Sequence, residues 1–334
     1  MLPDGRRLGA HLPLGGGMVA AVNRAQAIGL DTLQIFSDNP TAWRRRAEPP
    51  RELGAFRARV DEVGLGPLAI HAPYLVNLAG PDDMFHERSI DVLRHELTVA
   101  PTFGARFVNV HTGSHKGSGL EVGIERIASG IAAAFADVPD GPDPAILVLE
   151  NTAGGGGGIG VDVDELAALL EAIAARGVPL DRMAICLDTA HLWGAGHPID
   201  TADGVDRLVG EFGERIGIER LAMIHLNDSK SELGSRMDRH EHIGAGAIGP
   251  DGMRRILTHP DLRQVTYYLE TPGMDEGYDA INAQRARDLA EGRPLAILPP
   301  EAMNLPGARA RTGPSVEPAA EASAAEAGAA ELTG

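Results

Sequence analysis

The run AILVLE, residues 145–150, consists of five apolar residues followed by a carboxylate, and this pattern recurs along the chain. A run this short and this apolar is typical of a parallel strand that is buried on both faces. Seven comparable runs flank it: LGAHL (8–12), TLQIF (32–36), PLAIH (67–71), RFVNVH (106–111), MAICLD (183–188), LAMIHL (221–226) and VTYYLE (265–270). The sequence therefore contains eight candidate strands.

An amphipathic stretch follows each of these runs. The stretches span residues 17–28, 52–63, 84–103, 120–136, 164–175, 202–216, 250–257 and 276–289. Eight strands that alternate with eight helices predict a (β/α)₈ TIM barrel, an α/β fold that typically takes about 250 residues. We therefore assign residues 1–293 to a single catalytic barrel domain, and we expect the Ala-, Gly-, Pro- and Glu-rich residues 294–334 to form a disordered tail.

Composition narrows the class of protein. The 334 residues are 43% hydrophobic and 23% charged, as in ordinary globular chains. The single cysteine, Cys186, excludes a multi-cysteine metal cluster, so any metal must be held by histidines and carboxylates. No run is long enough to span a membrane, and the net charge of −17 argues against a broadly basic surface. We expect a cytoplasmic monomer with no membrane segment and no organic cofactor.

Metal-competent side chains gather where the chemistry of a barrel lies, at the carboxyl ends of its strands. Six of the eight runs end at or next to such a side chain, and three more candidates follow in the nearby loops. The nine residues are His71, His111, Glu150, Asp188, His191, His225, Asp238, His240 and Glu270. Histidines and carboxylates without a thiolate suit Zn²⁺, Mn²⁺, Co²⁺ or Fe²⁺. Nine ligands exceed the needs of one tetrahedral ion, so the sequence predicts a multinuclear site.

Multinuclear sites of this kind suit displacement at phosphorus, because one ion activates water while others neutralise charge on the attacking and leaving oxygens. Phosphoester hydrolysis is therefore the first hypothesis. A metal-dependent sugar isomerase or epimerase is the second, because such enzymes also hold a metal at a barrel mouth. Isomerases and epimerases need fewer metal ions, so the additional ligands His191, Asp238 and His240 would be surplus in such an enzyme and favour the hydrolase.

From about Gly9 to Glu270 the chain resembles the endonuclease IV family of apurinic/apyrimidinic endonucleases. The segments that carry the resemblance are GAHLPLGGG, QIFSDNPTAW, HAPYLVNLAGP, NVHTGSH, LENTAGGGGG, CLDTAHLWGAG, HLNDSK, GSRMDRHEHIGAGAIG and LET. The resemblance implies about three zinc ions, shared among the nine residues. It implies that His71 and His111 hold the first, that Glu150 bridges to a second held by Asp188, His225 and Glu270, and that His191, Asp238 and His240 hold the third.

The resemblance also implies the reaction. The family hydrolyses the phosphodiester 5′ to an abasic site in double-stranded DNA, leaving a 3′-hydroxyl and a 5′-deoxyribose phosphate, and it trims blocked 3′ ends. By resemblance Glu150 is the catalytic carboxylate that orients the bridging hydroxide, and Tyr74 and Leu75 form a wedge that enters the DNA. A non-catalytic protein that only binds abasic sites is a further alternative, although the complete ligand set argues against it.

The sequence departs from the family at Thr41, where an Arg that enters the base stack is usual. We hypothesise that one of the next three arginines, Arg44, Arg45 or Arg46, takes over part of this DNA contact, against the alternative of a solvated charge run. The glycine run at 154–158 predicts a mobile loop more than a phosphate cradle. Likewise, His11 and His115 are expected to be structural, and Asn227 and Lys230 either brace their loop or contact phosphate.

Overall fold

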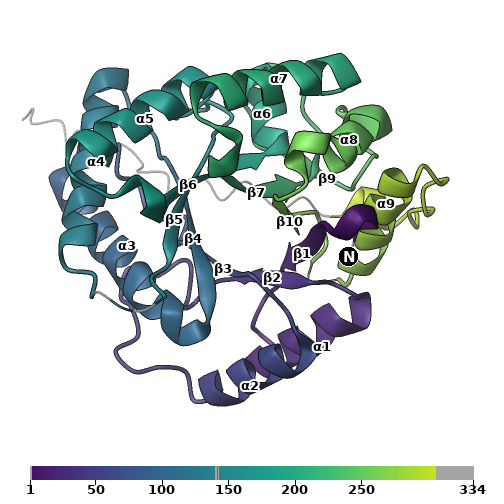
Figure 1. Cartoon of the computed structure of the whole chain (residues 1–334), viewed down its shortest axis with the longest axis horizontal. Coiled ribbons are helices and arrows are strands. Elements are labelled where there is room, and N and C mark those ends of the chain that lie inside the picture. The colour runs from purple at the N-terminus through teal and green to yellow at the C-terminus, as the bar shows by residue number, and fades with distance from the viewer. Residues whose placement is uncertain (1, 140, 142, 275, 306–334) are drawn as a thin grey trace, which may run out of the picture.

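The computed structural model describes residues 2–139, 141, 143–274 and 276–305 and shows a closed parallel barrel (Figure 1). Around the barrel the strands follow the order β1-β10-β7-β6-β5-β4-β3-β2. They are β1 (Arg7–His11), β2 (Thr32–Ile35), β3 (Leu68–His71), β4 (Ala105–His111), β5 (Ile146–Glu150), β6 (Met183–Asp188), β7 (Leu221–Leu226) and β10 (Thr266–Leu269). All eight coincide with the runs identified in the sequence, so the predicted barrel is confirmed.

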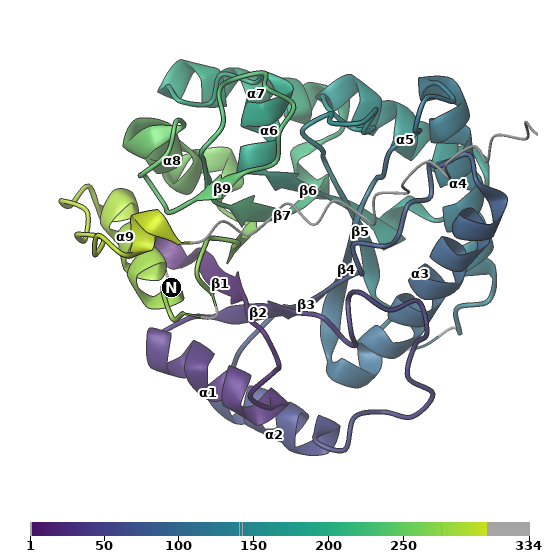
Figure 2. The same ribbon diagram turned by 180° about the vertical axis from the view of Figure 1, so that it is seen from behind.

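Helices surround the barrel on its outer face, as both views show (Figures 1 and 2). They are α1 (Met18–Ile28), α2 (Leu53–Val63), α3 (Asp83–Phe103), α4 (Leu120–Ala136), α5 (Val163–Ala175), α6 (Thr189–Ala195), α7 (Ala202–Arg215), α8 (Gly249–Thr258) and α9 (Asp279–Glu291). Short 3₁₀ turns are η1 (Pro3–Gly5), η2 (Leu180–Arg182), η3 (Ile218–Arg220), η4 (Pro260–Leu262) and η5 (Ala302–Asn304). Within the described residues, no helix has the length and apolarity needed to cross a membrane.

Several helices begin at side chains that satisfy their first backbone N–H groups. The carboxylates of Asp82 and Asp162 accept from the third residue of α3 and α5, and Thr201 does the same for α7. Each cap replaces a hydrogen bond that the helix cannot make internally, which typically contributes about 1 kcal/mol. These caps fix where each helix leaves its preceding loop, at the end of the barrel that carries the site.

One helix and one two-stranded hairpin near the candidate ligands were not predicted from the sequence. Helix α6 starts directly after β6, because Asp188 accepts a hydrogen bond from the backbone N–H of His191 at 2.9 Å. The hairpin of β8 (Asp228–Ser229) and β9 (His240–Glu241) folds the long loop after β7 back on itself. Both are too short to leave a periodic pattern in the sequence.

The interior of the barrel is filled by a separate apolar layer of Ala69, Phe107, Val148, Ala184, Cys186, Met223 and Tyr268. Four of these residues stand two positions before a predicted metal ligand on the same strand, and Tyr268 stands two positions before Glu270, which directly follows β10. Because strand side chains alternate between faces, residues two apart both point inward. The ligands therefore form the next layer, at the carboxyl end of the barrel, and Cys186 is an interior filler, as expected.

The first part of the expected tail, residues 294–305, lies within the described chain. Leu295 packs against the main core, Ala302 is completely buried, and Ala296 N–H donates to Asp288 of α9 at 3.0 Å. Residues 306–334, where the rest of the expected tail falls, lie outside the described residues. The packed chain thus extends beyond residue 293.

Candidate metal centre

The structure brings all nine predicted ligands to one place at the carboxyl ends of the strands. Groups of their donor atoms lie within 4.8 Å of one another in four overlapping sets: His71–His111–Glu150, His71–His225–Glu270, Glu150–Asp188–His225 and Asp188–His191–His240. The ninth residue, Asp238, lies 3.0 Å from His240 and 3.3 Å from His191. The roles of these residues as ligands stay a prediction, but their proximity is a property of the fold.

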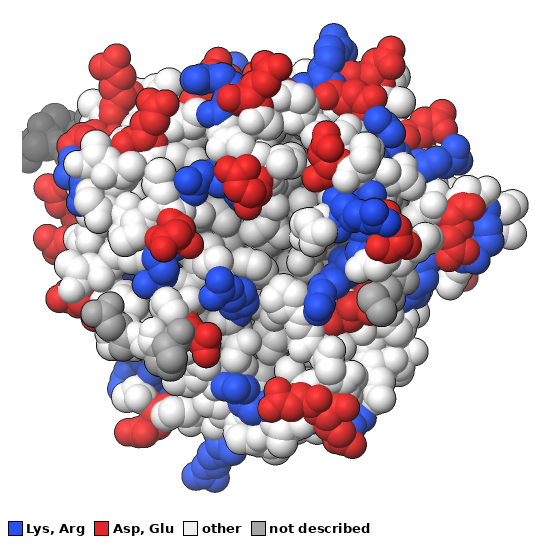
Figure 3. Space-filling view, viewed as in Figure 1, with Lys and Arg blue, Asp and Glu red and all other residues white. Residues whose placement is uncertain are grey.

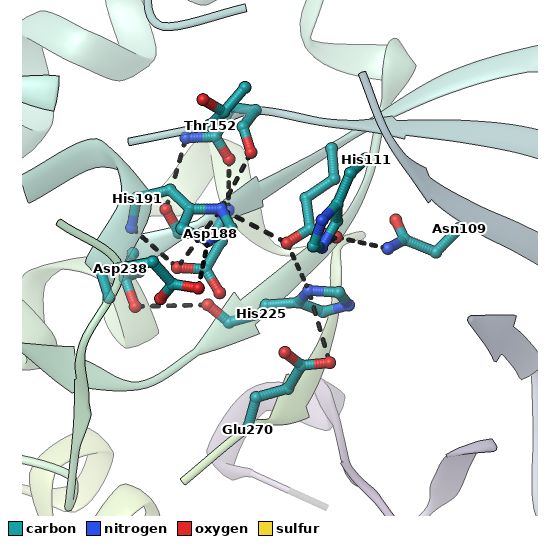
Figure 4. Close-up of polar contacts among 12 residues, drawn as sticks. Asn109, His111, Thr152, Asp188, His191, His225, Asp238 and Glu270 are labelled. Atoms are coloured by element: carbon teal, nitrogen blue, oxygen red, sulfur yellow. Dashed lines mark hydrogen bonds and ion pairs between the residues drawn. The ribbon is translucent and has the colours of Figure 1, made fainter. Parts of the chain in front are cut away.

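Glu150 lies among three of the candidate histidines, two of which, His111 and His225, are labelled in Figure 4. Its Oε2 lies 3.4 Å from His71 Nε2 and 3.3 Å from His111 Nε2, and its Oε1 lies 3.2 Å from His225 Nδ1. The carboxylate is almost completely buried at the end of β5. One carboxylate whose two oxygens face different histidines has the arrangement expected of a bridge between two cations.

A second group of donors lies around Asp238, on the loop after β7. Helix α6 presents His191 from its first turn, and His240 at the start of β9 lies 3.6 Å from Asp188 Oδ2. The loop can approach α6 closely because position 194 is glycine: a Cβ there would lie 2.9 Å from the carbonyl oxygen of Met237. This close approach brings Asp238 within reach of His191.

The tautomers of four histidines indicate a cation. Each has one ring N–H fixed by a protein acceptor: His71 Nδ1 by Ala72 O (2.6 Å), His191 Nδ1 by Asn151 O (2.9 Å), His240 Nδ1 by Glu270 O (2.6 Å) and His225 Nε2 by Gln34 Oε1 (3.0 Å). In the neutral imidazole the other ring nitrogen then turns a lone pair toward a carboxylate, which is repulsive unless a proton or a cation lies between them.

Two buried atoms support the same conclusion. Among the described residues, His225 Nδ1 and Glu150 Oε1 have no hydrogen-bond partner, although they face each other. A buried polar atom without a partner costs about 1–3 kcal/mol, so native structures rarely keep one without a reason. A divalent ion would be a partner for both atoms, and the donor set of the centre therefore fits a metal.

The electrostatics of the centre reflect its four carboxylates. Burial alone would raise the pKa of Glu150, yet His111 and His225 hold it well below its ordinary value. Burial likewise opposes the charged form of His240, but Asp238 and Asp188 raise the pKa of His240 to about 9. In the metal-free protein, protons therefore take part of the role that cations would have.

Amide side chains hydrogen-bond to several candidate ligands, and the sequence analysis did not predict these contacts. Asn109 Nδ2 donates to Glu150 Oε2 at 2.5 Å, and Gln34 Nε2 donates to Glu270 Oε1 at 2.6 Å. Asn227 Nδ2 donates to Asp188 Oδ2 at 2.7 Å, so Asn227 braces the centre. Their positions on the strands could have predicted this role, because Gln34 and Asn109 point inward at or near the layer of the predicted ligands.

The structure shows what His11 and His115 contact, and their expected structural roles stay a prediction. His11 Nδ1 lies 3.3 Å from Glu270 Oε1 and 3.1 Å from Gln34 Nε2, behind the ligands. His115 Nδ1 accepts from two backbone N–H groups of its own loop. A Cβ at Gly157 would lie 2.8 Å from the His115 ring, so packing against this ring explains one member of the glycine run.

The predicted DNA contacts fall into two groups. Tyr74 is 55% exposed at the edge of the centre, with its ring 5.6 Å from that of His71, and Leu75 beside it is half-buried. Arg44 and Arg46 are exposed on the loop after β2. Arg46 also lines a cleft of about 610 Å³ between this loop and the one after β1.

Arg45, by contrast, turns inward. Its side chain is 8% exposed, and Nη1 lies 3.5 Å from the buried carboxylate of Glu96. Its Nη2 donates to the carbonyl oxygen of Asn39 at 2.9 Å. Arg45 therefore holds the loop in place, and the hypothesis of a DNA contact is narrowed to Arg44 and Arg46.

Comparison with known proteins agrees with this architecture. Residues 22–293 match the family described as a xylose isomerase-like TIM barrel, which defines the class of the fold. A probable endonuclease 4 from Methanoculleus marisnigri is 42% identical over 283 residues, which cover 85% of this chain and 98% of the relative. One from Halothermothrix orenii is 38% identical over 84% of this chain and 99% of its own length.

A solved structure gives the same result. The crystal structure of endonuclease IV from Thermus thermophilus superposes with a TM-score of 0.73 at 36% identity, over 86% of this chain and 99% of that chain. The chain belongs to the endonuclease IV family. It is therefore an enzyme of the nuclease class.

Proposed function

We propose that this chain is a zinc-dependent hydrolase that cleaves the phosphodiester 5′ to abasic sites in double-stranded DNA and trims blocked 3′ ends. The observation that carries the proposal is the arrangement of nine ligand-type side chains around Glu150 and Asp238, with four imidazoles already fixed in the tautomer that a metal requires. The family to which the chain belongs supports the choice of DNA as substrate.

The resemblance to the endonuclease IV family implies how about three zinc ions would be shared among these donors. His71, His111 and Glu150 would hold one ion, and Glu150 would share a second with Asp188, His225 and Glu270. His191, Asp238 and His240 would hold the third. When bound, such ions supply an activated water at neutral pH and neutralise the charge of the phosphate oxygens.

The side chains of the protein position the substrate and the ligands. Glu150 is fixed by Asn109 and would orient the attacking water, while the apolar layer fills the barrel beneath the ligands. Tyr74, which is exposed beside His71 and His111, would enter the DNA at the vacant base position. An abasic nucleotide leaves the stack more easily than a paired base, because no pairing bond is broken.

Charge limits where the DNA can lie. The chain carries a net charge of −17. On the face seen in Figure 3, which is the end of the barrel where β1 begins and not the end that carries the candidate ligands, Lys and Arg are interspersed with Asp and Glu and form no continuous basic surface. Binding must then depend on a limited set of arginines and on the metal ions, and it should weaken steeply with salt.

The test is incision of a duplex that contains one tetrahydrofuran analogue of an abasic site. This analogue cannot undergo β-elimination, so a cut that leaves an extendable 3′-hydroxyl means hydrolysis. We expect untreated protein to cut, protein stripped by a strong chelator to be inactive, and added zinc to restore the cut. Folded, metal-loaded protein that leaves the duplex intact would refute the proposal and favour a sugar isomerase or a binding-only protein.

A further inference from the structure

The segment that follows the barrel contacts both loops that carry the last three candidate ligands. The match to the family ends at residue 293, but residues 294–305 continue along α9 as an ordered segment. We call residues 294–305 the strap. The strap contacts the loop after β7, which bears Asp238 and His240. It also contacts the loop after β10, which begins with Glu270.

The contact with the first loop passes through His242. This imidazole is completely buried, its Nδ1 accepts from Asn282 Nδ2 at 2.9 Å, and its Nε2 donates to the carbonyl oxygen of Ala302 at 3.0 Å. Asn282 thereby fixes the tautomer that the Ala302 carbonyl needs. His242 is two residues from His240, so the strap holds the backbone next to a candidate ligand.

Arg285 of α9 makes a second link between the strap and the same loop. Its Nε donates to the carbonyl oxygen of Ile243 at 2.6 Å, and its Nη1 donates to the carbonyl oxygen of Ala296 in the strap. The guanidinium is buried, with 6% of the residue exposed. Leu295 packs nearby: a Cβ at Gly244 would lie 3.0 Å from Leu295 Cδ1.

The other end of the strap meets the loop after β10. A Cβ at Gly273 would lie 2.8 Å from Leu305 Cδ1, so Leu305 covers the backbone three residues after Glu270. The two loops are also joined to each other, because the carbonyl oxygen of Glu270 accepts from His240 Nδ1 at 2.6 Å. Movement of either loop would therefore displace His240.

We propose that the strap is a positioning element that holds these two loops in register and so tightens the grip of the centre on the ion bound by Asp238 and His240. The inference rests on the proposed function for the presence of that ion. The effect of the strap on the order of the two loops does not depend on the proposed function, because this effect follows from the contacts alone.

The experiment uses the full chain with Leu295→Ala and Leu305→Ala, and the matched control Ile297→Ala, which lies in the same strap but is 90% exposed. Zinc release to a chromophoric chelator is followed in time. Because outer contacts of metal ligands typically change affinity about 10–100-fold, we expect one kinetic fraction of the zinc to leave about tenfold faster in both leucine variants. Ile297→Ala should release zinc like the unaltered protein.

Amide hydrogen exchange of the metal-free proteins is the second measurement. We expect faster exchange at residues 240–244 and 271–274 in the two leucine variants, with no change in β4 and β5. Exchange and zinc release equal to those of Ile297→Ala would overturn the proposal, and so would faster exchange throughout the barrel, which would make the strap a general stabiliser. Absence of zinc from the unaltered protein would count against the proposed function instead, and exchange would still decide the role of the strap.

Discussion

Replacing Gln34 with leucine should weaken the metal centre while leaving the barrel intact. Gln34 is completely buried at the end of β2, where its amide contacts two candidate ligands at once. Nε2 donates to Glu270 Oε1 at 2.6 Å, and Oε1 accepts from His225 Nε2 at 3.0 Å. Leucine has nearly the same volume but can make neither hydrogen bond.

The size of the effect follows from these contacts. A hydrogen bond to a charged group contributes about 1.5–3 kcal/mol, and the lost bond to Glu270 is of this kind. His225 Nε2–H also loses the acceptor that fixes its tautomer, so Nδ1 no longer keeps a lone pair directed at Glu150. Since about 1.4 kcal/mol is a factor of ten, we expect zinc affinity at this position to fall about 10–100-fold.

The assay is competition for zinc against a chromophoric chelator at constant pH, with metal content measured independently. Gln26→Leu is the matched control, because Gln26 is exposed on α1 and its amide oxygen accepts a hydrogen bond from Arg59, far from the candidate ligands in sequence. Zinc affinity of Gln34→Leu within about twofold of that of the control would show that the amide does not support the ligands, since outer contacts of metal ligands typically change affinity at least about tenfold.

Three further outcomes are expected. Gly9→Ala should lower the free energy of unfolding in urea by about 1–3 kcal/mol, because a Cβ at position 9 would lie 2.6 Å from the side chain of Thr32 on the next strand. The control Gly210→Ala, whose Cβ would lie in open space on α7, should be neutral or stabilising. Burial disfavours the charged form of His240, yet nearby carboxylates raise the pKa of His240 to about 9. Protonated His240 should therefore stabilise the metal-free protein fully below about pH 6.5, and this stabilisation should be lost as the pH rises through about 9. Zinc binding should accordingly release protons below that pH, and calorimetry in buffers of different ionisation enthalpy that finds no proton release at about pH 7 would contradict this. Arg46→Ala should reduce by about 1 the slope of log affinity for DNA against log salt, whereas the exposed Arg207→Ala on α7 should not; equal slopes for both variants would exclude Arg46 as a DNA contact.

The barrel could be predicted because each strand is a short, mostly apolar run followed by an amphipathic stretch, a pattern that is visible in a single sequence. Helix α6 and the β8–β9 hairpin could not, because they depend on contacts that form only after folding. The N-terminus of α6 is fixed by Asp188, and the hairpin brings His240 beside Asp188 from 52 residues away, at 3.6 Å.

The candidate ligands could be predicted because carboxyl ends of parallel strands meet at one end of a barrel. The amides that orient them could not, because Gln34 and Asn109 are distinguished from other buried polar residues only by which atoms they touch. Arg45 shows the converse: in sequence it is one of three equal arginines, and only its position above buried Glu96 separates it from its exposed neighbours.

The most direct test of the central claim is a titration of zinc into stripped protein, with incision of the tetrahydrofuran duplex measured after each addition. If the nine residues form a trinuclear centre, incision should reach its maximum at about three equivalents of zinc per chain. Full incision at one equivalent, or zinc uptake that saturates at one equivalent without incision, would contradict the account.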